Sequence, residues 1–516
     1  MSREAKNVVP HNEIQRWSVN GGTSDTDLQT IVFLVKSGEM DAAARAAASL
    51  QDKDIAASAW RQIARGNADL QRFEPALRAL ETALHFQPES PDLRLERAAI
   101  LESSGDMDGA LAELRWLGAN GFASPSLSAH LGRSLEFAGR VDEAEASVES
   151  ALERWPTDAG LHRLLAELRW SRGAHASLTE RLESAIRNHP QDLKLRLVAA
   201  DVLRNAGFDT RALHLLEEGL RRAPGSSAFL TSIGVLLDSL GRLDDALAYL
   251  QAAVERAPDS IPARRNLIPT LLRLGRPQQA LALCEGLLVQ SPDDQQLNAW
   301  RATSLRAMAH EDYAWLHDYP RLVRSYRLRS DHAGGIAGFN AEFALELTAL
   351  HSREQRPLSQ SLRGGSQTDR NLPAHRPIIA QFFAMLDAPI RDYIERLAPL
   401  DASHPTARRA PSDGAFRISG SWSVRLGPSG FHVNHVHPAG WLSSAYYVQL
   451  PPLNEGSREG WLAFGEPGIA IPGMHADHHV MPEAGMLVLF PSFMWHGTVP
   501  FTEGSRLTAA FDVVPR

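Results

Sequence analysis

Glycine recurs every 34 residues through the first 300 residues of this chain of 516, and this repeat constrains the fold more than any other feature. The glycines are Gly105, Gly139, Gly173, Gly207, Gly241 and Gly275. Proline keeps the same period at Pro156, Pro190, Pro224, Pro258 and Pro292. Two residue classes that share one period indicate an array of structural repeats, because such units bury their apolar faces only by stacking on one another.

Each period reads as a helix, a short turn at the glycine, a second helix and a closing proline. A small residue follows most of the glycines by five positions, at Ala110, Ala144, Ala212, Ala246 and Ala280, where it lets two helices approach closely. The first units are degenerate, since Gly38 is one residue out of register and Gln71 takes the place of a glycine. We therefore predict a polar tail over residues 1–20 and an N-terminal α-solenoid of seven or eight helix pairs over residues 21–300.

The stretch GRLDDALAYLQAAVERAPDS, from Gly241 to Ser260, resembles the tetratricopeptide repeat family in its period, glycine, alanine and proline. The resemblance covers about residues 21–300 and implies a concave surface that binds a peptide or protein. It specifies no ligand.

The 34-residue period stops after Trp300, and the residue pattern changes again near Phe416. Residues 301–409 contain aromatic and helical runs, and we predict a junction and a helical prelude there, with a glycine loop at RGGSQT. Residues 410–516 alternate and favour β-branched and aromatic residues, as in SSAYYVQL and GMLVLFPS. We expect six to eight short strands that form a jelly roll, or double-stranded β-helix, whose mouth suits a small site.

Histidines cluster in two short segments of this C-terminal region, GFHVNHVHPAGW and FPSFMWHGTVPF. If the first segment is a strand, His435 and His437 share one face and His432 points to the other. His496 follows an apolar run that predicts a buried strand. Three imidazoles on one side of a metal leave positions open for oxygen chemistry, whereas a closed structural zinc site needs a fourth ligand.

Arg506 lies ten residues after His496 on a predicted strand, SRLTAAFDV. A guanidinium buried in a small barrel needs an anionic partner, and a dicarboxylate supplies one with bidentate geometry. This context favours a metal site over a pair of merely hydrogen-bonded histidines.

The segment from Trp422 to Val514 resembles the 2-oxoglutarate and iron(II)-dependent oxygenases, and more narrowly a bacterial branch. The matching motifs are HVHP, GWLSSAYYVQLP, GMLVLFPSFMWHGTVPF and RLTAAFD. The resemblance implies Fe(II) bound by His435, His437 and His496, and 2-oxoglutarate anchored by Arg506, with O2 as the oxidant. It also implies that Tyr447 contacts the cosubstrate, and we add Ser443 as a further candidate contact.

One departure from better-studied branches concerns His437, which stands where they have a carboxylate. A neutral imidazole there lowers the anionic charge on the metal. Either His437 is a third ligand, or iron uses only His435 and His496 with water in the third position. Asp477 and Asp512 are the nearby carboxylates, and we assign Asp512 a structural part in the last strand.

Composition narrows the remaining classes of function. The net charge of -8 disfavours nucleic acid as a partner, and no window is long and apolar enough for a membrane span. A single cysteine, Cys284, excludes an intramolecular disulfide. Together with an N-terminus that lacks an apolar signal core, this favours a cytoplasmic protein. The oligomeric state is not indicated.

The leading hypothesis is a 2-oxoglutarate- and Fe(II)-dependent dioxygenase that hydroxylates a protein or peptide recruited by the repeat array. Two alternatives remain open. One is a small-molecule oxygenase with three-histidine iron of the cupin type, and the other is a non-catalytic repeat scaffold with a degenerate barrel.

Overall fold

A computed structural model of the chain describes residues 24–70, 72–351, 362–368, 371–452 and 456–516. Contacts along the chain divide it into two compact units, residues 1–123 and 124–516. The division falls inside the repeat array, next to Phe122, where the 34-residue proline series that includes Pro88 and Pro156 is interrupted.

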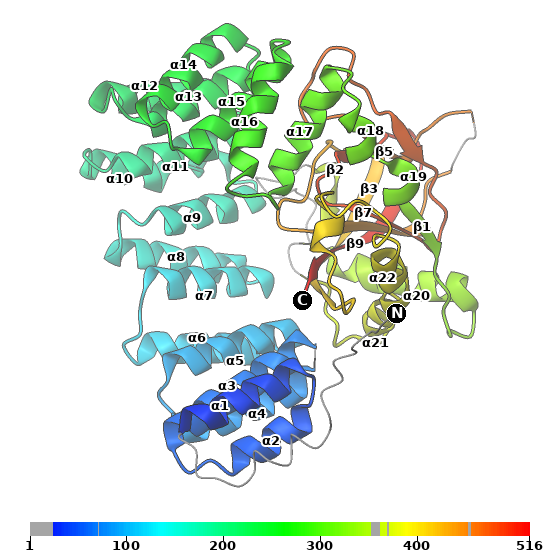
Figure 1. The fold of residues 1–516 in the computed structure, drawn as a ribbon. Coiled ribbons are helices and arrows are strands. Elements are labelled where there is room, and N and C mark those ends of the chain that lie inside the picture. The colour runs from blue at the N-terminus through cyan, green and yellow to red at the C-terminus, as the bar shows by residue number, and fades with distance from the viewer. Residues whose placement is uncertain (1–23, 71, 352–361, 369–370, 453–455) are drawn as a thin grey trace, which may run out of the picture. The chain divides into compact units, whose positions relative to one another are not determined.

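Both units contain antiparallel helix pairs that follow the predicted period (Figure 1). In the first unit the helices are α1 (Ser24–Lys36), α2 (Met40–Ala48), α3 (Lys53–Asp69), α4 (Phe73–Phe86), α5 (Pro91–Ser104) and α6 (Met107–Ala119). In the second they are α7 (Pro125–Phe137), α8 (Val141–Arg154), α9 (Ala159–Ser171), α10 (Glu180–Asn188), α11 (Leu193–Asn205), α12 (Asp209–Arg222), α13 (Ser227–Ser239), α14 (Leu243–Arg256), α15 (Ile261–Arg273), α16 (Pro277–Leu288) and α17 (Gln295–Ala307). The predicted solenoid of helix pairs is confirmed.

The periodic glycines end the first helix of each pair. All six have positive φ values, from 68° at Gly275 to 89° at Gly105, a conformation that glycine adopts at no steric cost. A third series with the same period caps the N-terminus of that helix. It consists of Ser90, Ser124, Asp158, Asp192, Ser226, Ser260 and Asp294. All but Ser226 accept a backbone N–H in the first turn, which stabilises a helix start by about 1 kcal/mol.

The repeat that follows Gly173 differs from the others. Its position five residues after the glycine is Leu178 instead of alanine, and a short 3-10 turn, η2 (His175–Ser177), precedes a shortened α10. Leu178 is itself buried, and the second helix of this pair begins later than in its neighbours.

Two antiparallel sheets form the C-terminal part of the second unit. The larger has the order β1-β7-β4-β9-β3-β2 and the smaller β6-β5-β8. The strands are β1 (Arg324–Arg327), β2 (Leu362–Gln367), β3 (Phe416–His432), β4 (Leu442–Gln449), β5 (Leu462–Phe464), β6 (His478–Val480), β7 (Met486–Pro491), β8 (His496–Thr498) and β9 (Arg506–Pro515). This arrangement agrees with the predicted jelly roll.

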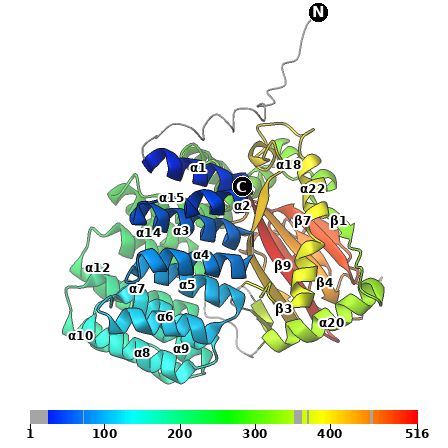
Figure 2. The ribbon, with the colours of Figure 1, turned by 90° about the horizontal axis from the view of Figure 1, so that it is seen from below.

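Helices from the segment before β3 lie against the larger sheet (Figure 2). They are α18 (Asp312–Leu316), α19 (Tyr319–Leu322), α20 (Gly335–Leu350), α21 (Pro377–Ala384) and α22 (Asp387–Glu395), with a 3-10 turn, η3 (Ala407–Arg409). Phe382 of α21 packs 5.1 Å from the ring of Tyr446 on β4 and 6.3 Å from that of Phe511 on β9. These contacts form one apolar core beneath the sheet.

The prelude is not purely helical, contrary to expectation. It supplies both edge strands of the larger sheet, β1 beside β7 and β2 beside β3. The RGGSQT segment, predicted to be a loop, is mostly strand β2. The glycines suggested a loop, but Gly365 lies within the strand for a packing reason. A Cβ atom there would meet the backbone of Arg425 on β3, and glycine within a strand often marks such a close approach.

The last repeat helix, α17, packs on the barrel within the second unit. The indole of Trp495, next to His496, lies 4.8 Å from that of Trp300 and donates to Thr303 Oγ1 at 3.0 Å. Arg306 donates to the main-chain oxygens of Gly465 and His475 at 3.0 and 2.8 Å. Among the described residues, no helix has the length and apolar character needed to cross a membrane.

Candidate metal centre

The three predicted histidine ligands are brought together by main-chain pairing. His435 and His496 exchange backbone hydrogen bonds of 3.0 and 3.1 Å, an isolated bridge beyond the end of β3. The main-chain N–H of His437 donates to Ser492 at 3.0 Å. The chain from β3 is thereby attached to the segment that joins β7 and β8, and each side chain starts from a fixed position.

Strand β3 ends at His432, so the expected two-residue alternation does not extend to His437. As a result, His432 does not point away from the pair as predicted. Its ring lies 5.3 Å from that of His435, nearly parallel to it. The two-residue alternation predicted that His435 and His437 lie together, as they do, but it gave the wrong direction for His432, because alternation applies only while the strand continues.

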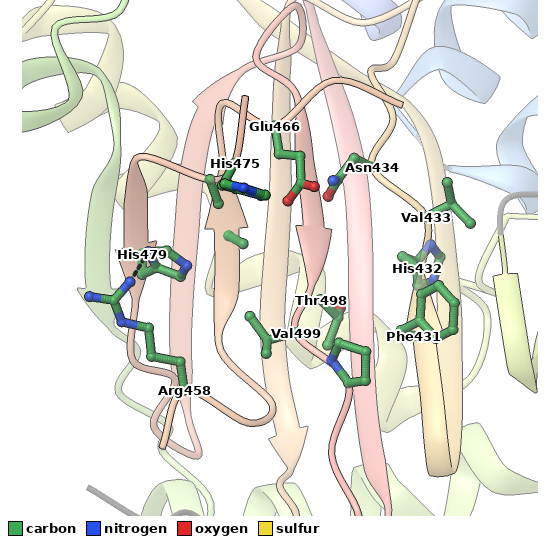
Figure 3. A pocket seen from close by; sticks show the side chains of 13 residues that line it. Phe431, His432, Val433, Asn434, Arg458, Glu466, His475, His479, Thr498 and Val499 are labelled. Carbon is green, nitrogen blue, oxygen red and sulfur yellow. Dashed lines mark hydrogen bonds between the residues drawn. The ribbon is translucent and has the colours of Figure 1, made fainter. Parts of the chain in front are cut away.

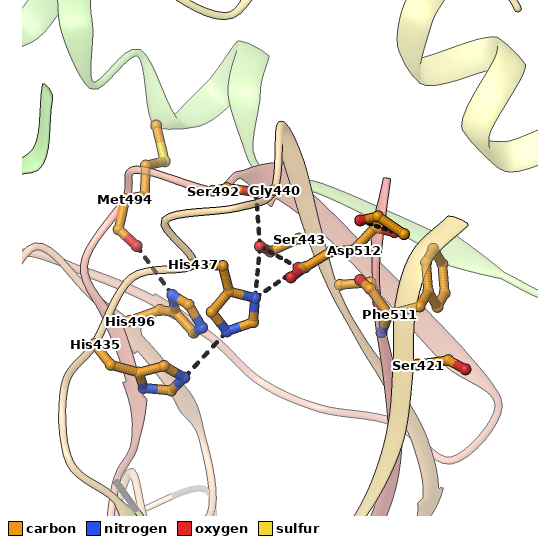
Figure 4. A network of polar contacts seen from close by, with 12 residues as sticks. Ser421, His435, His437, Gly440, Ser443, Ser492, Met494, His496, Phe511 and Asp512 are labelled. Atoms are coloured by element: carbon orange, nitrogen blue, oxygen red, sulfur yellow. Dashed lines mark hydrogen bonds and ion pairs between the residues drawn. The ribbon is translucent and has the colours of Figure 1, made fainter. Parts of the chain in front are cut away.

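Each ligand candidate directs one ring nitrogen at an acceptor and the other toward a common point (Figure 4). His435 Nδ1 lies 2.9 Å from Val433 O, and His496 Nδ1 lies 2.9 Å from Met494 O. A carbonyl oxygen only accepts, so Nδ1 carries the proton in both rings and leaves a lone pair on Nε2.

The spacing of the ring nitrogens fits a single metal ion. His435 Nε2 and His437 Nε2 are 3.2 Å apart, and the three ligand atoms lie within 4.8 Å of one another. Two nitrogens bound to one ion at about 2.1 Å are roughly 3 Å apart when the bonds meet at a right angle. Among the described residues, this is the only group of three or more such side chains with this spacing.

Burial keeps two of these rings neutral. It lowers the pKa of His435 to about 3, with a smaller contribution from the nearby His437. Burial also lowers the pKa of His496 well below its usual value. A neutral imidazole with its lone pair turned inward is the form that binds metal.

His437 has a side-chain partner in place of a carbonyl. Its Nδ1 donates to Asp512 Oδ1 at 2.6 Å and lies 2.9 Å from Ser443 Oγ. Ser443 Oγ in turn donates to Asp512 Oδ1 at 2.8 Å and lies 2.9 Å from Ser492 Oγ. Ser443, predicted to contact the cosubstrate, therefore lies beside His437 and Asp512. The predicted structural part of Asp512 did not include this contact.

Arg506 is buried at the start of β9, with 4% of its surface exposed. The guanidinium group donates to Thr498 Oγ1 and lies 5.1 Å from the ring centre of Tyr447. Within the described part of the chain its Nε has no hydrogen-bond partner, and the hydroxyl of Tyr447 makes no hydrogen bond of normal geometry. A buried cation whose Nε has no acceptor among the described residues suits an anionic ligand such as a carboxylate.

A pocket of about 470 Å³ adjoins this centre (Figure 3). His432 and Thr498 line it, and these residues contact His435 and Arg506 respectively. Polar side chains at its other edges come from Asn434, Arg458, Glu466, His475 and His479. The sequence motifs did not identify Thr498 or Asn434, although Thr498 lies two residues after His496 and therefore on the same face of β8.

The other candidate residues lie outside the cluster. Asp477 accepts hydrogen bonds from Tyr313 and Tyr319 at 2.6 and 2.7 Å. His478, next to Asp477, stacks on Tyr319 with 4.6 Å between the ring centres. Tyr446 donates to Asn340 at 2.6 Å on the helical side of the sheet, which leaves Tyr447 as the tyrosine that faces Arg506.

Fold and site together define a helical repeat array joined to a double-sheet barrel with a histidine cluster. Residues 420–512 match the family described as "Putative 2OG-Fe(II) oxygenase". Two tetratricopeptide repeat models match, one at residues 62–123, 130–177 and 197–261 and the other at 239–303. The chain thus contains tetratricopeptide repeats fused to a domain of this oxygenase family.

Solved structures with similarity to the chain include repeat proteins. A thermophilic tetratricopeptide repeat protein of Thermus thermophilus is 26% identical over 36% of this chain and 100% of its own, with a TM-score of 0.29. One from Parabacteroides merdae is 15% identical over 48% of this chain and 98% of its own, with a TM-score of 0.29. Human IFIT1, solved with a capped RNA, is 16% identical over 59% of this chain and 78% of its own, with a TM-score of 0.32. No curated protein matches the sequence.

Proposed function

We propose that this chain is a 2-oxoglutarate- and Fe(II)-dependent dioxygenase that hydroxylates a protein or peptide. The observation that carries the proposal is the pairing of three converging imidazoles with a buried guanidinium group that has no carboxylate partner among the described residues. His435, His437 and His496 would hold the metal. The alternative in which only two histidines bind receives less support, because His437 Nε2 lies 3.2 Å from His435 Nε2.

Arg506 and Tyr447 would bind and orient 2-oxoglutarate. A dicarboxylate has a second carboxylate at the end away from the atoms that would reach the metal. The Arg506 guanidinium, which donates to Thr498 two residues after His496, is the cation available to it. Bound iron would supply the oxidative decarboxylation of 2-oxoglutarate with O2 and the hydroxylation coupled to it. The surrounding apolar core, including Phe464 and Phe490, keeps water from the buried side of the cluster.

The repeat array supports a macromolecular substrate. Tetratricopeptide repeats form extended surfaces that bind peptides and proteins, and α17, the last repeat helix, contacts the residue next to His496. A protein held by the repeats is therefore attached to the part of the chain that bears the metal. This placement favours hydroxylation of a recruited protein over the two alternatives named above.

The test combines turnover with substrate capture. Purified protein loaded anaerobically with Fe(II) should convert 2-oxoglutarate to succinate on addition of O2. A His496→Ala variant should capture the partner without modifying it, and the active enzyme should then add about 16 mass units, one oxygen atom, to the captured protein. A modified metabolite with no modified protein would redirect the assignment to small molecules. Absence of both 2-oxoglutarate binding and succinate would favour the scaffold.

A further inference from the structure

We infer that Asp512 is a positioning residue for the metal, acting through His437. The inference rests on the proposed function only for the identity of the metal. Asp512 does not reach the common point of the three Nε2 atoms. It binds the far side of the one imidazole that lacks a main-chain acceptor, at 2.6 Å.

The carboxylate of Asp512 is built into the sheet, which fixes its direction. On β9 it pairs with Gly420 of β3 on one side and with Ser443 of β4 on the other. The Ser443 hydroxyl donates to Oδ1 at 2.8 Å. A Cβ atom on Gly440 would lie 3.2 Å from the carboxylate carbon, so the turn before β4 also packs against the group.

The charge of Asp512 explains how its contact with His437 would favour metal binding. Asp512 is 9% exposed, and its only ion-pair partner among the described residues is His437. A buried carboxylate without compensation is costly, and a cation bound to Nε2 of the same ring would balance it. In return, a ring that donates to a carboxylate is a stronger metal ligand than one that donates to a neutral carbonyl.

Ser443 determines which nitrogen of the His437 ring carries the proton. Its hydroxyl donates to Asp512 and so accepts from His437 Nδ1 and from Ser492. The contacts on this side of the ring are then satisfied when Nδ1 carries a proton, which assigns Nε2 to the metal. A metal at this centre would thus be bound by three imidazoles. The nearest negative charge would be the Asp512 carboxylate, which contacts the metal only through His437.

The test is a Co(II) titration of the full-length protein, without 2-oxoglutarate or turnover. Asp512→Asn should weaken Co(II) binding about 10- to 100-fold and shift its visible absorption. His437→Ala should also weaken binding, and adding Asp512→Asn to it should cost nothing more. Glu483→Gln, which removes a surface carboxylate paired with Arg327, is the matched control and should bind as the wild type does.

Two results would overturn the inference: wild-type affinity in Asp512→Asn, or losses that add in the double variant, which would mean that Asp512 acts on the fold. Unfolding temperatures of the metal-free proteins show whether each variant folds. If Asp512→Asn does not, Ser443→Ala retains the carboxylate and should show a smaller loss that disappears in the His437→Ala background. If the single and double variants bind Co(II) as expected but the wild type forms no succinate, the proposed function is rejected and the role of Asp512 stands.

Discussion

Arg506 brings a positive charge into a part of the barrel where the described residues offer no carboxylate. Arg425, on the neighbouring strand β3, is exposed to solvent, so two arginines on paired strands have opposite environments. This contrast makes them a matched pair for measuring the contribution of the buried charge.

Arg506→Met should weaken 2-oxoglutarate binding about 10- to 100-fold, since a hydrogen bond to a charged group contributes roughly 1.5–3 kcal/mol. Anaerobic titration of the Fe(II)-loaded protein with 2-oxoglutarate measures the change. Arg425→Met should bind as the wild type does. Equal affinities in all three proteins would remove Arg506 from the proposed site.

His351 gives a prediction about stability and pH. Its Nδ1 lies 2.8 Å from Ser366 Oγ and its Nε2 3.0 Å from Ser423 Oγ, and burial lowers its pKa to about 4. The unfolded chain therefore binds the proton more tightly than the folded one. The stability contribution is complete above pH about 6.5 and is lost as pH falls toward about 4.

Urea unfolding near pH 7 and near pH 5 measures this effect as a difference between proteins. The wild type should lose on the order of 1 kcal/mol more than His351→Gln between the two conditions, after allowance for partial exposure of the ring. The same loss in both proteins would show that another group carries the pH dependence.

At the residue level, the sequence predicted the histidine cluster and Arg506 because each stands in a short motif. It did not predict the partners that orient them. Asp512 is 75 residues away from His437, and the two meet because the chain after His437 pairs with β9, through Trp441 and then β4. A side-chain contact that depends on strand register cannot be predicted from short motifs when the two strands are distant along the chain.

Strand β8 has no space for a side chain at its central residue, Gly497. A Cβ atom on Gly497 would overlap the Asn434 side chain and lie 3.0 Å from His432 O. The close approach of the two segments, and with it the bridge between His435 and His496, depends on glycine at this position.

Gly497→Ala should destabilise the protein by about 1–3 kcal/mol, as overpacking in a core does, and should also weaken Co(II) binding. Gly118→Ala in α6 is the control, because a Cβ atom there has no other atom within 4 Å. Because Gly118 lies in the last turn of α6, this change should leave stability unchanged or raise it by less than about 1 kcal/mol. Thermal unfolding and Co(II) titration of both variants check the contrast.

The helical elements were the more predictable part of the fold. Glycine turns and prolines act locally, so their spacing reported the helix pairs directly. The edge strands β1 and β2 were missed because a four-residue strand such as Arg324–Arg327 has no pattern of its own. It becomes a strand only by pairing with β7, which is a tertiary interaction.

At the scale of the whole molecule, the repeats and the barrel of the second unit are not independent. The predicted boundary between residues 300 and 301 falls inside α17. Val436 and Trp495, each next to a candidate ligand, share one apolar cluster with side chains of α15, α16 and α17. Removing those helices would expose the cluster to water.

A fragment of residues 310–516 should therefore fold poorly and bind Co(II) weakly or not at all. Each large apolar side chain that becomes exposed costs about 1.5–3 kcal/mol. A fragment of residues 124–516, which keeps the whole second unit, should bind Co(II) as the full chain does. Comparable affinity of the shorter fragment would show that the barrel is self-sufficient.

The three imidazoles differ in what fixes their orientation, and this difference has an evolutionary consequence. The rings of His435 and His496 are held by carbonyl oxygens of Val433 and Met494, which every amino acid possesses. Mutation at those two positions leaves the acceptor in place. The ring of His437 is held by a side chain, so a single codon change at position 512 is enough to alter it. Divergence in metal preference among descendants of this chain should therefore be sought first at residue 512.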